Sequence, residues 1–120
     1  VLILYALEEN KMILNFDAMD LTLLEKFYGG EKAVQAKMHV DEHNKIMRSV
    51  LEPGASVGYH THETSSEIIY VLQGSGKVLY DDGEERVESG VCHYCPKGHA
   101  HSLINDGTEN LVFFAVVPNQ

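Results

Sequence analysis

The sequence predicts an all-β domain, a sandwich or barrel of about nine short strands. From residue 32 onward, short runs of β-branched, aromatic and aliphatic residues alternate with clusters of turn residues. No stretch in this part of the chain has the length and period of a long helix. The predicted strands are 32–40, 45–51, 56–62, 67–72, 76–80, 84–88, 91–95, 100–105 and 110–117.

The segments between these runs contain Gly, Pro, Asp and Asn, which favour turns for different backbone reasons. Asp82-Gly83 and Asp106-Gly107 are dipeptides typical of two-residue hairpin turns. We therefore expect each of them to join two antiparallel strands. The chain shows no repeat of fixed period and no linker, so residues 32–120 are predicted to form one barrel domain.

Residues 1–31 form a less regular N-terminal segment. Asp20 can cap a short helix from Leu21 to Phe27, which the Gly-Gly pair that follows would end. The apolar run Val1–Leu7 is predicted to pack on the barrel or on a partner chain. It is too short to span a bilayer, and two glutamates follow it where a signal peptide would have a small-residue cleavage site. We therefore expect a cytoplasmic protein without a membrane segment.

The composition is that of an ordinary folded domain with an acid excess. The chain has 120 residues, of which 44% are hydrophobic and 22% are charged, and these proportions exclude wholesale disorder. Its 18 acidic and 9 basic residues give a formal net charge of −9. This charge would repel phosphate backbones and argues against nucleic-acid binding. The 7 histidines are many for so short a chain and direct attention to metal chemistry.

The two cysteines, Cys92 and Cys95, have the spacing of a redox or zinc motif. They lie in a run with the composition of a strand, where residues three apart point to opposite faces. The two sulfurs could then neither pair nor share a metal, and a zinc site would need a second pair. We interpret both as ordinary small side chains.

His60 and His62 are separated by one residue within a predicted strand. This spacing places both imidazoles on one face, about 7 Å apart along the chain. Glu67 follows after a polar turn and opens an apolar run. A carboxylate buried there without a partner would cost several kcal/mol, and a metal ion is one way to offset that cost. His101 opens another predicted strand and can complete the set.

The glycines around the first three of these residues fall in a fixed pattern, Gly54-x5-His60-x-His62-x4-Glu67-x6-Gly74. Glycine at both ends of the pattern is suited to turns with positive φ. By itself a His-x-His pair is often a surface feature, so the full spacing carries the argument.

A second pattern, Gly90-x5-Pro96-x-Gly98-x2-His101-x3-Asn105, follows 15 residues after the first one ends. Together the two patterns resemble the two motifs of the cupin family at every fixed position. The resemblance covers approximately residues 45–117. One difference is Val91, where many members of the family have Asp; it puts a turn hydrogen bond in doubt, but not the ligand positions.

The resemblance implies a cupin-type jelly-roll barrel of about six to eight strands. It also implies that His60, His62, Glu67 and His101 bind one divalent metal inside the barrel. Three imidazoles and a carboxylate suit Mn, Fe, Co, Ni or Zn better than Mg or Ca. In an octahedral ion this set leaves two positions for water or substrate. Asn105 is expected to bond backbone at the end of a strand.

Several further polar residues have open roles. Arg48, on the strand before the first pattern, either points into the barrel to bind an anionic substrate or forms an outward salt bridge. His99 either faces the substrate or lies in a turn. The facing of His93 cannot be fixed from the sequence, and His39 and His43 are expected to be exposed beside a loop.

The family resemblance does not determine the reaction, because one scaffold hosts many chemistries. Oxalate decarboxylases of the family carry an arginine three residues before the first ligand histidine, and this chain has Val57 there. That activity is therefore disfavoured. The leading hypothesis is a metal-dependent enzyme of the dioxygenase, isomerase or lyase type that acts on a small, polar, oxygen-bearing metabolite. The alternative is a binding or sensor module without turnover, and no general acid or base can be named.

The strand that Glu67 opens also predicts an interface. If Glu67 points into the barrel, the even positions Ile68, Tyr70 and Leu72 point outward. A row of outward apolar side chains needs a cover. Together with Val1–Leu7 this face predicts a homodimer.

Overall fold

The computed structural model of the chain describes residues 12–120. The run Val1–Leu7 lies outside the described residues, so its packing stays a prediction. The described part contains ten strands in two antiparallel sheets, with two short 3-10 turns, η1 (Phe16–Ala18) and η2 (Phe27–Gly29). The strands are β1 Thr22–Glu25, β2 Ala33–Val40, β3 Asn44–Leu51, β4 Ser56–Thr61, β5 Glu67–Gln73, β6 Ser75–Tyr80, β7 Gly83–Glu88, β8 Cys92–Cys95, β9 Ala100–Ile104 and β10 Leu111–Pro118.

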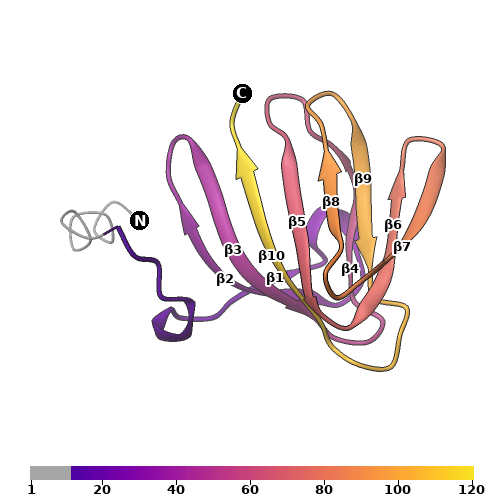
Figure 1. Ribbon diagram of the computed structural model, residues 1–120, viewed down its shortest axis with the longest axis horizontal. Helices are drawn as coiled ribbons and strands as arrows, with labels where there is room; N and C mark the ends of the chain where they lie inside the picture. Colours follow the sequence, from indigo (N-terminus) through magenta and orange to yellow (C-terminus); the bar gives the residue numbers. More distant parts are fainter. Residues whose placement is uncertain (1–11) are drawn as a thin grey trace.

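The six-stranded sheet has the order β1-β2-β3-β10-β5-β8, and the four-stranded sheet has the order β4-β9-β6-β7. Figure 1 shows β2, β3, β10 and β5 side by side, with β9, β6 and β7 at the other side of the molecule. Strands distant in sequence thus become neighbours, as β10 does between β3 and β5. This is the jelly-roll architecture that the family resemblance implied, and all nine strands predicted from the residue pattern are confirmed.

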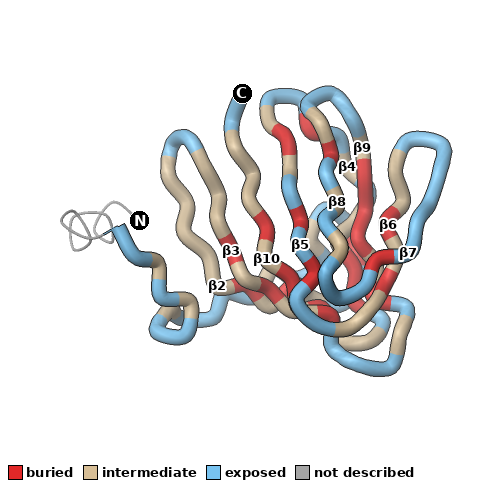
Figure 2. The backbone as a smooth tube through the Cα atoms, viewed as in Figure 1, coloured by how far each residue is buried: buried red, intermediate tan, exposed pale blue. Residues whose placement is uncertain are grey.

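The core lies between the two sheets, and strand alternation decides which side chains enter it. In β5, Ile69 and Val71 are buried, whereas Ile68, Tyr70 and Leu72 are each about two fifths exposed, at 38%, 42% and 43%. The predicted inward and outward positions of this strand are confirmed. Figure 2 shows buried stretches of β3, β5, β9 and β10, and mostly exposed connecting turns. The core side chains are Val34, Ala36, Met47, Leu51, Ala55, Ile69, Val71, Val78, Val87, Leu103, Leu111, Phe113 and Ala115.

The short helix expected from Leu21 to Phe27 is wrong. Thr22–Glu25 instead form β1, which pairs antiparallel with the start of β2. Leu24 packs against the core while Leu23 is 56% exposed, which is the alternation of an edge strand. Pairing with an existing sheet edge outweighs the weak local preference of a short helix.

The hairpin expected at Asp106-Gly107 is also wrong. β9 and β10, on either side of this dipeptide, belong to different sheets, so the segment crosses between them. Asn105 holds the crossing: its buried side-chain amide donates to the carbonyl oxygens of Leu51 and Glu109, each at 2.8 Å. The other dipeptide, Asp82-Gly83, does lie at the turn of a hairpin, which joins β6 and β7. The residue with a left-handed backbone conformation in this turn is Asp81. The structural role expected of Asn105 is confirmed.

Within residues 12–120, no helix is long and apolar enough to cross a membrane.

Candidate metal centre

Two adjacent strands of the four-stranded sheet bring the first pair of histidines together. His60 on β4 and His101 on β9 are direct partners in the antiparallel register. The register shifts between Val57 and His60, so a bulge reorients the end of β4. Gly58 in this bulge lies against the backbone of Tyr28, where a Cβ atom would overlap with the Tyr28 carbonyl.

His62 and Glu67 complete the cluster from the turn between β4 and β5. His62 follows β4, and its backbone N–H donates to the carbonyl oxygen of His99 at 2.9 Å, which ties the turn to the start of β9. Glu67 is the first residue of β5 and pairs with Cys95. All four predicted ligands therefore meet in the interior between the sheets.

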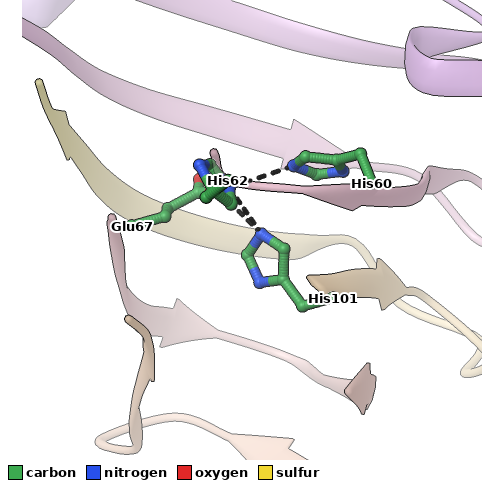
Figure 3. A group of neighbouring side chains, drawn as sticks. All are labelled: His60, His62, Glu67 and His101. Atoms are coloured by element: carbon green, nitrogen blue, oxygen red, sulfur yellow. Dashed lines mark hydrogen bonds and ion pairs between the residues drawn. The ribbon is translucent and has the colours of Figure 1, made fainter. Parts of the chain in front are cut away.

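The four donor atoms face one another at short range (Figure 3). The Nε2 atom of His62 lies 3.1 Å from Nε2 of His60, 3.0 Å from Nε2 of His101 and 3.2 Å from Oε1 of Glu67. Oε1 of Glu67 lies 2.9 Å from Nε2 of His101. All four atoms lie within 4.8 Å of one another. One ion could contact every donor of the cluster.

Neighbouring donors are separated by distances similar to those between the ligands of one metal ion. Two ligands at right angles with bonds of about 2.1 Å are separated by about 3.0 Å, close to the distances between neighbouring donors in this cluster. Tetrahedral ligands with the same bonds would be about 3.4 Å apart. Three imidazoles and one carboxylate are a donor set for Mn, Fe, Co, Ni or Zn. The cluster is therefore able to bind a metal ion.

The second ring nitrogen of each histidine in the cluster also has a contact. Nδ1 of His60 lies 2.8 Å from the carbonyl oxygen of Gly58, and Nδ1 of His62 lies 2.8 Å from Oγ of Ser65. Nδ1 of His101 lies 2.9 Å from Nε2 of His93. Such outer contacts fix the ring orientation and the tautomer, so each Nε2 is directed at the centre.

Burial and the neighbouring groups set the charge state of the centre. Burial favours the neutral form of Glu67, but hydrogen bonds to His101 and His62 overcome it and hold the pKa of the carboxyl at about 2. Burial lowers the pKa of His60 below its usual value. Burial, with the adjacent His101, lowers the pKa of His93 to about 4. At neutral pH the centre offers a carboxylate together with neutral imidazoles at His60 and His93.

A cavity of about 310 Å³ opens from the cluster. Apolar side chains line its wall, among them Met47, Val57 and Phe113. Lys45 is the one lysine or arginine among the described residues that line it, and the acidic side chains there are Glu63 and Glu67. The ring of Tyr28 lies at the same cavity and stacks on His60, with 4.0 Å between ring centroids and 10° between planes.

The structure does not bring Arg48 or His99 to the cluster. Arg48 lies on the outer side of β3, where its Nη2 pairs with Oδ1 of Asp17 at 2.6 Å and the guanidinium lies over the Phe16 ring. His99 is half-exposed and its Nδ1 lies 2.8 Å from Oδ2 of Asp81. Neither residue lines the cavity described above.

His93 is the residue that sequence reasoning left undecided. It pairs with Ile69 in the β5–β8 ladder and points inward like its partner. The signal that could have oriented it is parity, because His93 lies two residues before the buried Cys95. This signal can be used only if β8 is known to pair with β5. The two strands are not consecutive in the chain, so their pairing cannot be read from the sequence.

Cys92 is exposed and Cys95 is buried, and both are free, as expected for opposite faces of a strand. The side chain of His43 is 77% exposed, as expected, whereas that of His39 is only 23% exposed and contacts Asp41.

The chain is similar in sequence to a protein family and to individual relatives. A family model described as "Cupin domain" matches residues 47–117. The chain is 40% identical over 79 residues to the "Oxalate-binding protein" of Thermotoga maritima, covering 62% of this chain and 64% of that protein. It is 37% identical over 65 residues to a "Glucose-6-phosphate isomerase" of Thermococcus gammatolerans, covering 50% of this chain and 34% of that protein. The match thus spans less than two thirds of either relative.

Among solved structures, the chain is similar to a "predicted oxalate decarboxylase" from Thermotoga maritima. The two share 26% sequence identity and a TM-score of 0.85, and the match covers 91% of this chain and 100% of that one. The similarity includes most of the described residues and not the ligand-bearing strands alone.

Proposed function

The chain belongs to the cupin domain family, and from this premise we propose that its barrel binds one divalent transition metal and uses it to capture a small, oxygen-bearing metabolite. The observation that carries the proposal is the cluster of His60, His62, Glu67 and His101, with neighbouring donor atoms 2.9 to 3.2 Å apart. A metal held there would serve as a Lewis acid and as a template for oxygen donors.

The residues of the chain prepare this centre for a chelating ligand. The outer contacts to Gly58, Ser65 and His93 direct the three Nε2 atoms inward, so little reorganisation is needed on binding. The ionised Glu67 offsets part of the metal's charge. Four protein donors in an octahedral arrangement leave two positions, which suits a ligand that binds through two oxygens.

We favour a small dicarboxylate of the oxalate type as that ligand. Support comes from the name of the Thermotoga maritima relative and from a cavity of about 310 Å³, which is ample for a molecule of this size. Lys45 at the cavity supplies a positive charge. Val57 occupies the position of the arginine expected in decarboxylases, so we propose capture without decarboxylation.

Turnover of a bound metabolite is the second candidate function. A reaction of the dioxygenase, isomerase or lyase type needs the same two free metal positions, and a relative named as an isomerase is 37% identical to this chain over 65 residues. In this case the bound metabolite would be converted and released instead of being held.

The proposed function is tested by metal analysis and calorimetry. Protein purified without added metal should contain close to one transition-metal ion per chain, and His60→Ala with His101→Ala should abolish this content. The surface variant His43→Ala is the matched control and should retain it. A metal content below about 0.2 per chain in the unaltered protein would contradict the metal site.

Binding and turnover are then separated with oxalate as the probe. The metal-loaded protein should bind oxalate and rise in melting temperature, while the metal-free protein and acetate, which has one carboxylate, should give little effect. Oxalate recovered unchanged supports capture. Loss of oxalate, or conversion of a sugar phosphate offered in parallel, would support an enzyme instead.

We also propose a homodimer formed through the outer face of β5. Ile68, Tyr70 and Leu72 are partly exposed there, and Tyr94 on the adjacent strand β8 is 57% exposed. A second copy would remove this apolar row from water. Sedimentation at micromolar concentration tests the proposal, and a monomer would contradict it.

A further inference from the structure

His93 contacts the metal cluster from outside, and nothing in the two sequence patterns includes it. Its Nε2 lies 2.9 Å from Nδ1 of His101, and the two rings are 29° from parallel with centroids 5.1 Å apart. The other two ligand histidines have a backbone carbonyl and a serine hydroxyl at this position. His101 therefore depends on a second imidazole for its outer contact.

A metal bound at Nε2 would determine which nitrogen of His101 carries the proton. Nε2 of His101 faces the other donors, 3.0 Å from His62 and 2.9 Å from Glu67, so it must offer a lone pair to a metal. The proton of the neutral ring then resides on Nδ1, which donates to Nε2 of His93. For His93 to accept, it must itself be neutral with its proton on Nδ1.

The surroundings leave His101 no ready substitute for this contact. The side chain of His101 is only 2% exposed, so water does not reach its Nδ1–H freely. A buried N–H without an acceptor costs about 1–3 kcal/mol, and the ring can avoid that cost by turning away from the metal position. His93 is held in place from the opposite sheet, since it pairs with Ile69 on β5.

We propose that His93 is a positioning residue, which accepts the Nδ1–H of His101 and thereby holds that ring in the tautomer and orientation needed for metal binding. This inference rests on the proposed metal site and adds the residue that sets its geometry. It predicts a loss of metal affinity when the acceptor is removed, since outer-contact partners of metal ligands typically contribute 10- to 100-fold.

The test compares three substitutions of His93 in the full chain. His93→Gln keeps an acceptor oxygen near the position of Nε2 and should bind Zn²⁺ or Co²⁺ within about 3-fold of the unaltered protein. His93→Leu has no acceptor, and His93→Asn is too short to reach His101; both should lose about 10- to 100-fold in affinity. The control, His43→Leu, removes a surface histidine and should leave the affinity unchanged.

A spectroscopic readout distinguishes positioning from packing. In the Zn²⁺-loaded protein, nitrogen-15 NMR should show a proton on Nδ1 of His101, and His93→Leu should shift or broaden this signal. The Co²⁺ absorption bands should change in His93→Leu and be restored in His93→Gln. Equal losses in all three variants, or none in His93→Leu, would overturn the role of His93. An unaltered protein that binds neither metal would instead overturn the proposed function, and this inference with it.

Discussion

Nε2 of His101 lies 2.9 Å from Oε1 of Glu67, and the two side chains are only 2% and 12% exposed. The carboxylate comes from the six-stranded sheet and the imidazole from the four-stranded one. In the metal-free protein, where Nε2 of His101 can carry the proton, this contact joins the two sheets by a charge-assisted hydrogen bond in the interior. The low pKa of Glu67, about 2, shows that its hydrogen bonds favour the ionised form more than burial disfavours it.

Replacing this carboxylate should weaken both the fold and the metal site. Glu67→Gln keeps the size of the side chain but removes its charge, so we expect the metal-free protein to lose about 1–3 kcal/mol of unfolding free energy. We also expect metal affinity to fall at least 10-fold. Urea unfolding and metal titration measure the two effects, with the exposed Glu88→Gln as control. Unchanged stability and affinity in Glu67→Gln would contradict the assignment.

The metal-free protein should lose stability as the pH falls from about 6.5 to about 4. The folded state holds the pKa of His93 at about 4 and lowers that of His60, whereas both imidazoles have ordinary values near 6.5 when unfolded. Within this window the unfolded chain binds protons that the folded chain does not, so acid favours unfolding. The contribution of Glu67 is largely retained in this window, and it is lost progressively as the pH falls from the ordinary carboxyl value of 4.5 to about 2, the pKa of Glu67 in the folded protein.

Urea unfolding of chelator-treated protein at several pH values measures this decline. His93→Leu removes one of the two histidines and should make the decline shallower. A stability that stays constant between pH 7 and pH 5 would show that the histidines do not resist protonation.

Gly58→Ala should be strongly destabilising. An added Cβ would overlap with the backbone carbonyl of Tyr28, which cannot move without shifting the whole turn beside β4. We expect a loss of more than about 2 kcal/mol and weaker metal binding, because Tyr28 stacks on His60. Gly107→Ala is the control, since its Cβ would meet atoms no closer than 3.5 Å. Thermal melting measures the stability of both variants. Equal melting temperatures for Gly58→Ala and Gly107→Ala would argue against a close backbone contact at Gly58.

The two cysteines should react differently with a thiol reagent. Cys92 is exposed, whereas Cys95 is buried and burial raises the pKa of its thiol to about 11. Since the thiolate is the reactive form, we expect one alkylated cysteine in the native protein and two in denaturant. Mass spectrometry of peptides after labelling identifies the site. Native labelling at Cys95, or a disulfide between the two, would contradict the strand geometry.

The succession of strands along the chain could be predicted from the sequence, because it depends on local spacing. The four candidate ligands could be named because the two patterns that contain them resemble the cupin motifs. Alternation along a strand places His60 and His62 on one face and separates Ile69 from Tyr70 without knowledge of the neighbouring strands. Turn residues between the runs then mark where each strand ends. Strand alternation and turn residues are properties of a few consecutive residues, so they can be recognised in the sequence without knowledge of the tertiary structure.

Pairing between strands distant in sequence could not be predicted in the same way. Leu21–Phe27 has a weak helical pattern, yet Thr22–Glu25 pairs with β2 and forms a strand. Asp106-Gly107 has a hairpin sequence, yet the chain crosses to the other sheet there.

By itself the sequence determined the strand pattern, the inward side of β5 and the residues of the candidate metal centre. Only the tertiary structure decided that Arg48 faces outward to Asp17 and that His93 faces inward to His101. The reason is that a side chain's face follows from the register of its strand against a partner. That register is set by which distant strands pair and by how the two sheets pack, and no local run of residues contains this information.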